Sequence, residues 1–171
     1  MTETTGDTGH VYLVRHGKTG LNAGHYIRGH ANPALDQAGL VEAHALATVL
    51  ATKRLVQVIS SPLDRAADTA RIIAETSRVP HSTDDRFTDR DYGPWTGYSE
   101  FTVAGRWGSP GQAPGVEGTE SVLARARPAL DAVLDTAPGG PVAVVTHNAV
   151  IRALLADLAP GRFRPNDPVT F

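Results

Sequence analysis

The stretch VYLVRHGKTGLN, residues 11–22, places an arginine, a histidine and a glycine directly after four residues that favour a strand. Residues 11–14 are typical of a short buried strand, and the glycine that follows indicates a turn. In open α/β sheets, ligands gather outside the carboxyl ends of the strands. Arg15 and His16 therefore stand where a ligand site is expected, although an ordinary polar turn is the alternative at this point.

The rest of the chain alternates between predicted strands and predicted helices. Further strands are expected at residues 56–60 and 142–145. Helices are expected around residues 40–50, with Asp36 as the N-cap, and at residues 64–77, 119–133 and 151–158. Residues 84–118, rich in glycine and proline, predict an irregular excursion with one short helix. This order is typical of an α/β fold, a three-layer α/β/α sandwich with a mostly parallel central sheet.

Composition limits the possible functions. The 171 residues fit a single domain, 1–171, and we expect residues 1–9 to be disordered. A formal charge of −2 gives no general attraction to nucleic acid or to an anionic membrane surface. The absence of cysteine excludes disulfides, thiolate catalysis and cysteine-based zinc sites. Without a signal peptide or a stretch of roughly 20 apolar residues, a cytoplasmic location is expected.

Three predicted strands end in polar residues. They end in Arg15 and His16, in a serine pair followed by Arg65, and in a threonine followed by His147. If these strands are neighbours in one parallel sheet, two histidines and two arginines meet at one edge of it. Each residue alone has an ordinary explanation, as a structural histidine or a solvated arginine. Their occurrence at three successive strand ends favours a functional site.

This set of side chains suits phosphoryl transfer. Guanidinium groups bind phosphate oxygens through planar, charge-assisted hydrogen bonds. A neutral imidazole can attack phosphorus, and nearby arginines keep it neutral by disfavouring the protonated form. A second histidine can donate to the oxygens as charge develops, and a carboxylic acid is needed to protonate the leaving group.

The same residues match a known family. The chain resembles the histidine phosphatase superfamily, in the branch that includes cofactor-dependent phosphoglycerate mutases and many small phosphatases. The resemblance rests on LVRHGKTGLN, SSPLDRAADTA and VVTHNAVIRALL, which lie in family order across nearly the whole chain. It implies a phosphoglycerate mutase-like fold, with His16 as the phosphorylated nucleophile. It also places Arg15, Arg65 and His147 in the phosphate pocket.

The proton donor is less closely matched. In FTDRDYGPWTG, residues 87–97, Asp89 holds the family's acid position, where many relatives have glutamate. Aspartate is shorter by one methylene, so the backbone must bring it closer to the leaving group. Asp91, two residues on, is the alternative donor if the loop is shifted.

The substrate-facing side departs more from the family pattern. Asn22 matches, whereas Tyr26 stands where relatives carry an arginine, and Arg28 with its following glycine replaces a glutamine-glycine pair. The candidate substrate-binding residues are therefore Gly17, Thr19, Asn22 and Arg28. For Arg28, which departs from the family pattern, an exposed loop cation is the alternative. His25 and His30 are expected at the surface, with no metal site.

Residues 84–118 are expected to line or cap the site with their aromatic side chains, with packing beneath a loop as the alternative. The aromatic residues concerned are Trp95, Tyr98, Phe101 and Trp107.

The resemblance implies a metal-independent phosphomonoesterase without a cofactor. His16 attacks the phosphate, and Asp89 first protonates the leaving oxygen and then activates water. The alternatives are a mutase-type phosphoryl transferase and a weakly catalytic phosphate- or phosphopeptide-binding module. Hydrolysis is favoured because the chain is shorter than the mutases and has little sequence after His147. The expected partner is a small phosphorylated metabolite or a phosphoprotein, not nucleic acid or a membrane; a homodimer is also conceivable.

Overall fold

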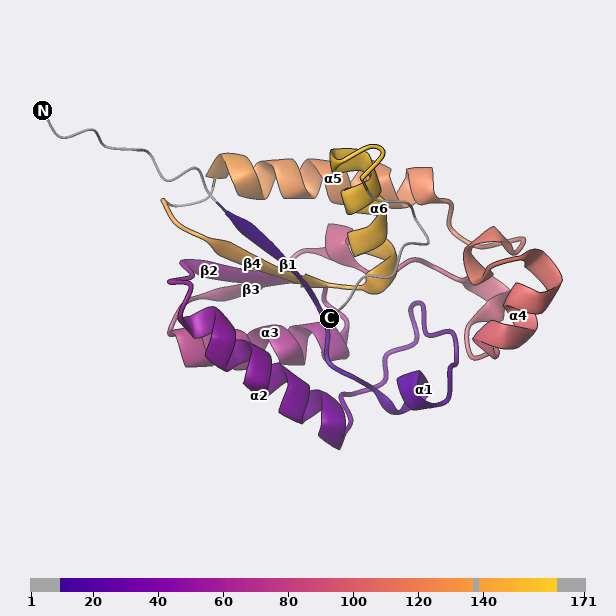
Figure 1. Cartoon of the computed structure of the whole chain (residues 1–171), viewed down its shortest axis with the longest axis horizontal. Helices are drawn as coiled ribbons and strands as arrows, with labels where there is room; N and C mark the ends of the chain where they lie inside the picture. The colour runs from indigo at the N-terminus through magenta and orange to yellow at the C-terminus, as the bar shows by residue number, and fades with distance from the viewer. Residues whose placement is uncertain (1–9, 137–138, 163–171) are drawn as a thin grey trace, which may run out of the picture.

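Four parallel strands form one sheet at the centre of the fold (Figure 1). This description covers residues 10–136 and 139–162 of a computed structural model. The strands are β1 (Val11–Arg15), β2 (Gln57–Ser60), β3 (His81–Thr83) and β4 (Val142–Thr146), in the spatial order β1-β4-β2-β3. The predicted parallel sheet is thereby confirmed. The prediction of disorder for residues 1–9 lies outside the described residues.

The register of the sheet brings three strand ends level with one another. Arg15 of β1 pairs with Thr146 of β4, and Ser60 of β2 pairs with Val145. Just beyond these pairs, the His16 amide donates to the Thr146 carbonyl oxygen over 3.1 Å. The residues that follow β1, β4 and β2 therefore meet at one edge of the sheet, where parallel α/β folds hold their ligands.

Helices cover both faces of the sheet. Figure 1 shows α2 and α3 on one face and α5 and α6 on the other. The helices are α1 (Gly20–Ala23), α2 (Gln37–Ala51), α3 (Asp64–Ser77), α4 (Glu100–Trp107), α5 (Thr119–Thr136) and α6 (Asn148–Leu158). Three short 3-10 turns occur at η1 (Asp85–Phe87), η2 (Gly93–Trp95) and η3 (Pro110–Gln112). Each helical prediction corresponds to a helix, whereas α1 and β3 were not predicted.

The apolar pattern explains how the layers pack. All five residues of β4 are buried, because this strand has neighbours on both sides and helices on both faces. The side chains of Ala143 and Val145 pack toward α2 and α3, and those of Val142 and Val144 toward α5 and α6. Helix α2 begins where predicted, since the Asp36 side chain accepts a hydrogen bond from the Gly39 amide over 2.8 Å.

Two glycines let the chain after β1 cross the first turn of α2. A Cβ atom on Gly17 would lie 2.5 Å from the Gly39 carbonyl oxygen. A Cβ atom on Gly39 would lie 2.0 Å from the Lys18 carbonyl oxygen. Neither position has room for a side chain, so this crossing fixes where the residues after His16 lie.

The segment between β3 and α5 contains α4 and packs as a separate small unit. In Figure 1 it lies to the side of the sheet toward which the strands point. A small core joins its Val103 and Ala113 to Ile27 from the chain between α1 and α2, with Trp95 and Trp107 packed against them. None of the helices in the described residues is both long and apolar enough to cross a membrane.

Candidate active site

His16 follows β1 directly and is held in one neutral form. Its Nδ1 atom lies 2.6 Å from the Gly17 carbonyl oxygen, which can only accept, so Nδ1 carries the ring hydrogen. The Nε atom of Arg65 donates to His16 Nε2 over 3.2 Å, and a guanidinium group can only donate. Nε2 therefore presents its lone pair. This is the nitrogen that a covalent nucleophile requires.

The surroundings of His16 strongly disfavour its protonation. The side chain is buried, and burial together with the positive charge of Arg65 lowers its pKa from 6.5 to about 3. Arg15 and Arg28 act in the same direction. At neutral pH the ring is therefore uncharged, and its Nε2 lone pair is held by the Arg65 Nε hydrogen, which must release it before Nε2 can attack.

Arg65 connects the site residues. It comes from the first turn of α3 and is fully buried. Its Nη2 atom donates to Asp89 Oδ2 over 3.0 Å and to the Gly29 carbonyl oxygen over 2.9 Å, while Nη1 donates to the Ala31 carbonyl oxygen over 2.8 Å. The pattern predicted a phosphate-binding arginine at this position. In this structure the guanidinium group lies between His16 and Asp89.

His147 follows β4 and lies beside His16, with 5.1 Å between the ring centroids. Its Nε2 atom is 2.8 Å from Ser61 Oγ. Because Ser61 Oγ accepts from the Leu63 amide, it can donate its own proton to Nε2, which leaves the ring hydrogen on Nδ1. Among the described residues, this buried Nδ1 has no hydrogen-bond partner. Burial and the charge of Arg65 hold the pKa of His147 well below its usual value.

Asp89 provides the carboxyl group of the site. Its Oδ2 atom lies 3.0 Å from Arg65 Nη2 and 3.6 Å from His147 Nδ1, and its Oδ1 atom accepts from the Arg90 amide over 2.9 Å. Burial raises the pKa of Asp89, although Arg65 opposes this effect. The alternative donor, Asp91, is exposed, and its carboxylate accepts from the amide of Gly93. The structure thus places Asp89, and not Asp91, next to Arg65 and His147.

A cavity of about 900 Å³ opens over His16 and Asp89, whereas Arg15, Arg65 and His147 are not among its lining residues. His16, Asp89 and Arg28 line it, as do the first residues of α6, whose free amide groups favour anions. Arg15 is half-buried; burial and the charge of Arg28 lower its pKa. Residues 84–118 line the cavity through Tyr92, Glu100 and residues 109–112. The aromatic residues singled out in the sequence are not among its lining.

The other candidate substrate-binding residues have local partners. The Thr19 amide and Thr19 Oγ1 both donate to Asn22 Oδ1 over 2.9 Å, which fixes the start of α1. The Gly17 amide donates to Thr69 Oγ1 over 3.1 Å. Of the four residues, Arg28 lines the cavity. A substrate-binding role for Gly17, Thr19 and Asn22 stays a prediction.

Several residues of the site were not found from the sequence. Ser61 orients His147, and Thr69 holds the turn after His16. His30 is exposed as predicted, yet its Nε2 atom donates to the Asp89 carbonyl oxygen over 2.9 Å. These contacts join segments that are far apart in sequence, so no local pattern reveals them. In the described part of the chain, no three histidine or carboxylate side chains are grouped as a metal site.

Comparison with known proteins agrees with this geometry. A sequence profile of the histidine phosphatase superfamily (branch 1) matches residues 11–165. The chain is 30% identical over 164 residues to a glucosyl-3-phosphoglycerate phosphatase of Mycolicibacterium vanbaalenii, covering 86% of this chain and 73% of that protein. It is 33% identical over 155 residues to a bifunctional protein of Mycobacterium tuberculosis. That match covers 85% of this chain and 43% of the relative, so the chain spans less than half of that protein.

Solved structures show the same fold. The protein YhfR of Bacillus stearothermophilus matches with a TM-score of 0.84 and 26% identity. This match covers 94% of the present chain and 85% of that one. The phosphoglycerate mutase-like fold expected from the sequence motifs is confirmed.

Proposed function

Because the chain belongs to the histidine phosphatase superfamily (branch 1), we propose that it hydrolyses phosphomonoesters through a phosphohistidine on His16. One observation carries this proposal: His16 Nε2 holds a lone pair within a buried group of arginine, histidine and aspartate side chains. With its hydrogen on Nδ1, the ring can form a bond to phosphorus through Nε2 once Arg65 Nε releases that atom.

In the first step, His16 Nε2 attacks phosphorus in line with the leaving oxygen. Arg15, Arg65 and the Nδ1–H of His147 bind the other phosphate oxygens, which carry the charge that develops during transfer. Both hydrogens of Arg65 Nη2 are already directed at acceptors, one of them Asp89. Arg65 Nε must release His16 Nε2 so that its lone pair can attack, and the phosphate then takes the place of Asp89 at Arg65 Nη2.

This displacement prepares Asp89 to act as the acid. Loss of the Arg65 contact and arrival of a phosphate dianion both raise the pKa of the Asp89 carboxyl group, because each disfavours its anion. The protonated carboxyl group then gives its proton to the leaving alkoxide. In the second step the carboxylate takes a proton from water, which attacks the phosphohistidine, releases inorganic phosphate and restores neutral His16.

The substrate class follows from the cavity and from the relative. The cavity over His16 is lined by polar and charged side chains, among them Arg28, Arg90 and Glu100. Such a lining suits a hydrophilic leaving group. The relative from Mycolicibacterium vanbaalenii is named for a phosphatase of glucosyl-3-phosphoglycerate. We therefore propose a small phosphorylated metabolite with a hydroxyl-rich leaving group as the substrate.

Hydrolysis of p-nitrophenyl phosphate in excess EDTA tests the function. Wild type should release p-nitrophenol and inorganic phosphate in equal amounts, and His16→Ala should lose this activity. His44→Ala is the matched control, because His44 is exposed on α2 and lies outside the cavity lining. Equal rates for wild type and His16→Ala, or loss of activity with EDTA, would refute the proposal. Transfer of phosphate from a bisphosphate donor to an acceptor would instead indicate a mutase.

A further inference from the structure

The segment that carries Asp89 has an unusual set of backbone contacts. Residues 86–89 run from the 3-10 turn η1 into irregular chain, and all four of their carbonyl oxygens accept hydrogen bonds from side chains. Thr146 Oγ1 donates to the Phe87 carbonyl oxygen over 2.6 Å. The other three carbonyl oxygens, those of Arg86, Thr88 and Asp89, accept from a single residue, Arg125.

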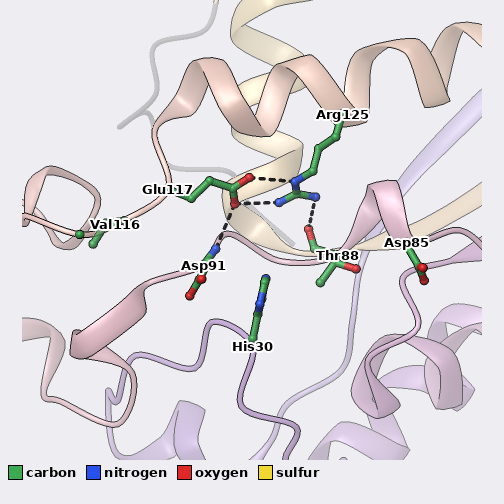
Figure 2. A pocket seen from close by; sticks show the side chains of 8 residues that line it. His30, Asp85, Thr88, Asp91, Val116, Glu117 and Arg125 are labelled. Atoms are coloured by element: carbon green, nitrogen blue, oxygen red, sulfur yellow. Dashed lines mark hydrogen bonds and ion pairs between the residues drawn. The ribbon is translucent and has the colours of Figure 1, made fainter.

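Arg125 reaches this segment from α5, and all five of its N–H groups have acceptors. Nη1 donates to the Arg86 and Thr88 carbonyl oxygens over 2.9 and 2.6 Å, and Nη2 donates to the Asp89 carbonyl oxygen over 3.1 Å. The remaining two N–H groups donate to the two carboxylate oxygens of Glu117, each over 2.9 Å. Figure 2 shows the guanidinium group between Glu117 and Thr88.

Glu117 and His30 complete the arrangement. Glu117 Oε2 also accepts from the Asp91 amide over 3.0 Å, which fixes the chain just after Asp89. Although partial burial alone would raise the pKa of Glu117, its hydrogen bonds from Arg125 and from the Asp91 amide hold that pKa below the usual value. His30 donates to the same Asp89 carbonyl oxygen that Arg125 binds. The backbone around Asp89 is therefore held on both sides.

We propose that Arg125 is a positioning residue, which holds the carbonyl oxygens of residues 86, 88 and 89 and so sets the Asp89 carboxyl group against Arg65 and His147. This inference rests on the proposed function, because it assigns proton transfer to Asp89. Aspartate reaches less far than glutamate, so its backbone must be placed more accurately. Misplacement by about 1 Å can cost on the order of 100-fold in rate.

The test separates proton transfer from the other steps by changing the leaving group. The value of kcat/KM is measured for p-nitrophenyl phosphate, whose leaving group needs little help from an acid, and for phenyl phosphate, whose more basic leaving group needs a proton. In Arg125→Met, kcat/KM for phenyl phosphate should fall about 10- to 100-fold. For p-nitrophenyl phosphate it should change less than about fivefold, because attack by His16 is unaffected.

Arg127→Met is the matched control. Arg127 lies two residues after Arg125 on the same helix and forms ion pairs with Asp131 and Asp157, away from the Asp89 segment. Its loss removes comparable surface interactions and should leave the ratio of the two kcat/KM values unchanged. Arg125→Lys keeps the charge but cannot reach all of the carbonyl oxygens, so it should shift the ratio in the same direction as Arg125→Met.

A neighbouring cavity allows chemical rescue. A space of about 670 Å³ lies beside Arg125 and includes Thr88, Asp91 and Glu117 in its lining (Figure 2). In Arg125→Ala, added guanidinium ion at millimolar concentration should enter this space and restore hydrolysis of phenyl phosphate more than that of p-nitrophenyl phosphate. A side chain that only stabilises the fold would give no rescue that depends on the leaving group.

A second measurement does not depend on activity. Carbon-13 NMR titration of the Asp89 carboxyl group should show a changed pKa in Arg125→Met, because displacement of the carboxyl group alters both its burial and its contact with Arg65. Arg127→Met should show no such change. The inference would be overturned if kcat/KM for both esters fell by the same factor in Arg125→Met, or if the Asp89 titration were unchanged. If wild type hydrolyses neither ester, the proposed function fails, and the titration alone decides the role of Arg125.

Discussion

His16 should stay neutral at a pH that protonates an ordinary histidine. Its pKa of about 3 compares with 6.5 for a free side chain, because the ring is buried beside Arg65. When the pH is lowered from 7.5 to 5, an ordinary histidine becomes about 97% protonated, whereas His16 becomes about 1% protonated. The structure further predicts that its hydrogen stays on Nδ1, which donates to Gly17.

Nitrogen-15 NMR of the histidine rings measures both properties. The His16 signals, assigned by their loss in His16→Gln, should keep the pattern of a neutral ring with a protonated Nδ1 from pH 7.5 to 5. Arg65→Met should raise the pKa of His16, since it removes the nearest positive charge. A wild-type midpoint near 6.5, or a ring with its hydrogen on Nε2, would refute the reasoning about the nucleophile.

Three further predictions concern the charge of His16, the close approach at Gly39 and the acid role of Asp89. Because the folded-state pKa of His16 lies below its unfolded value, the contribution of neutral His16 to the free energy of unfolding is fully present above pH 6.5 and is lost on acidification. Urea unfolding should therefore show that His16→Gln loses about 2 kcal/mol less than wild type between pH 7.5 and 5; equal losses would contradict this. Gly39→Ala should destabilise the fold by more than about 2 kcal/mol, because its Cβ would meet the Lys18 carbonyl oxygen. Gly105→Ala is the control, since no atom lies near the added Cβ. Similar urea midpoints for the two variants would argue against the close approach of the chain after β1 to α2. Asp89→Asn should lower kcat/KM about 100-fold or more for phenyl phosphate and far less for p-nitrophenyl phosphate, and an equal loss for both would exclude Asp89 as the acid.

The regular elements that build the sheet were predictable because their apolar patterns are strong. Residues 11–14 and 142–145 are nearly continuous apolar runs, and those of β4 are buried on both faces, whereas most of β1 is only partly buried. Strand β3 was missed because His81, Ser82 and Thr83 include no apolar residue, and only backbone pairing with β2 at the edge of the sheet makes them a strand. Helix α1 has four residues, too few for a helical period.

The candidate site was predictable where its side chains follow strands. Arg15, His16 and His147 stand at strand ends, and parallel order alone brings them to one edge of the sheet. Asp89 lies in irregular chain, so only the family resemblance pointed to it. The contacts of Arg125 could not be foreseen, because it binds backbone carbonyl oxygens, which every residue possesses and no sequence motif marks.

Trapping the phosphorylated enzyme tests the central claim most directly. Wild type is mixed with p-nitrophenyl phosphate, quenched within milliseconds under alkaline conditions that preserve phosphohistidine, digested and analysed by mass spectrometry. We predict a phosphoryl group on Nε2 of His16 that forms and decays during turnover, and its absence from His16→Ala. Turnover without a phosphorylated enzyme, or with the phosphoryl group on another residue, would contradict the assignment of His16 as the nucleophile.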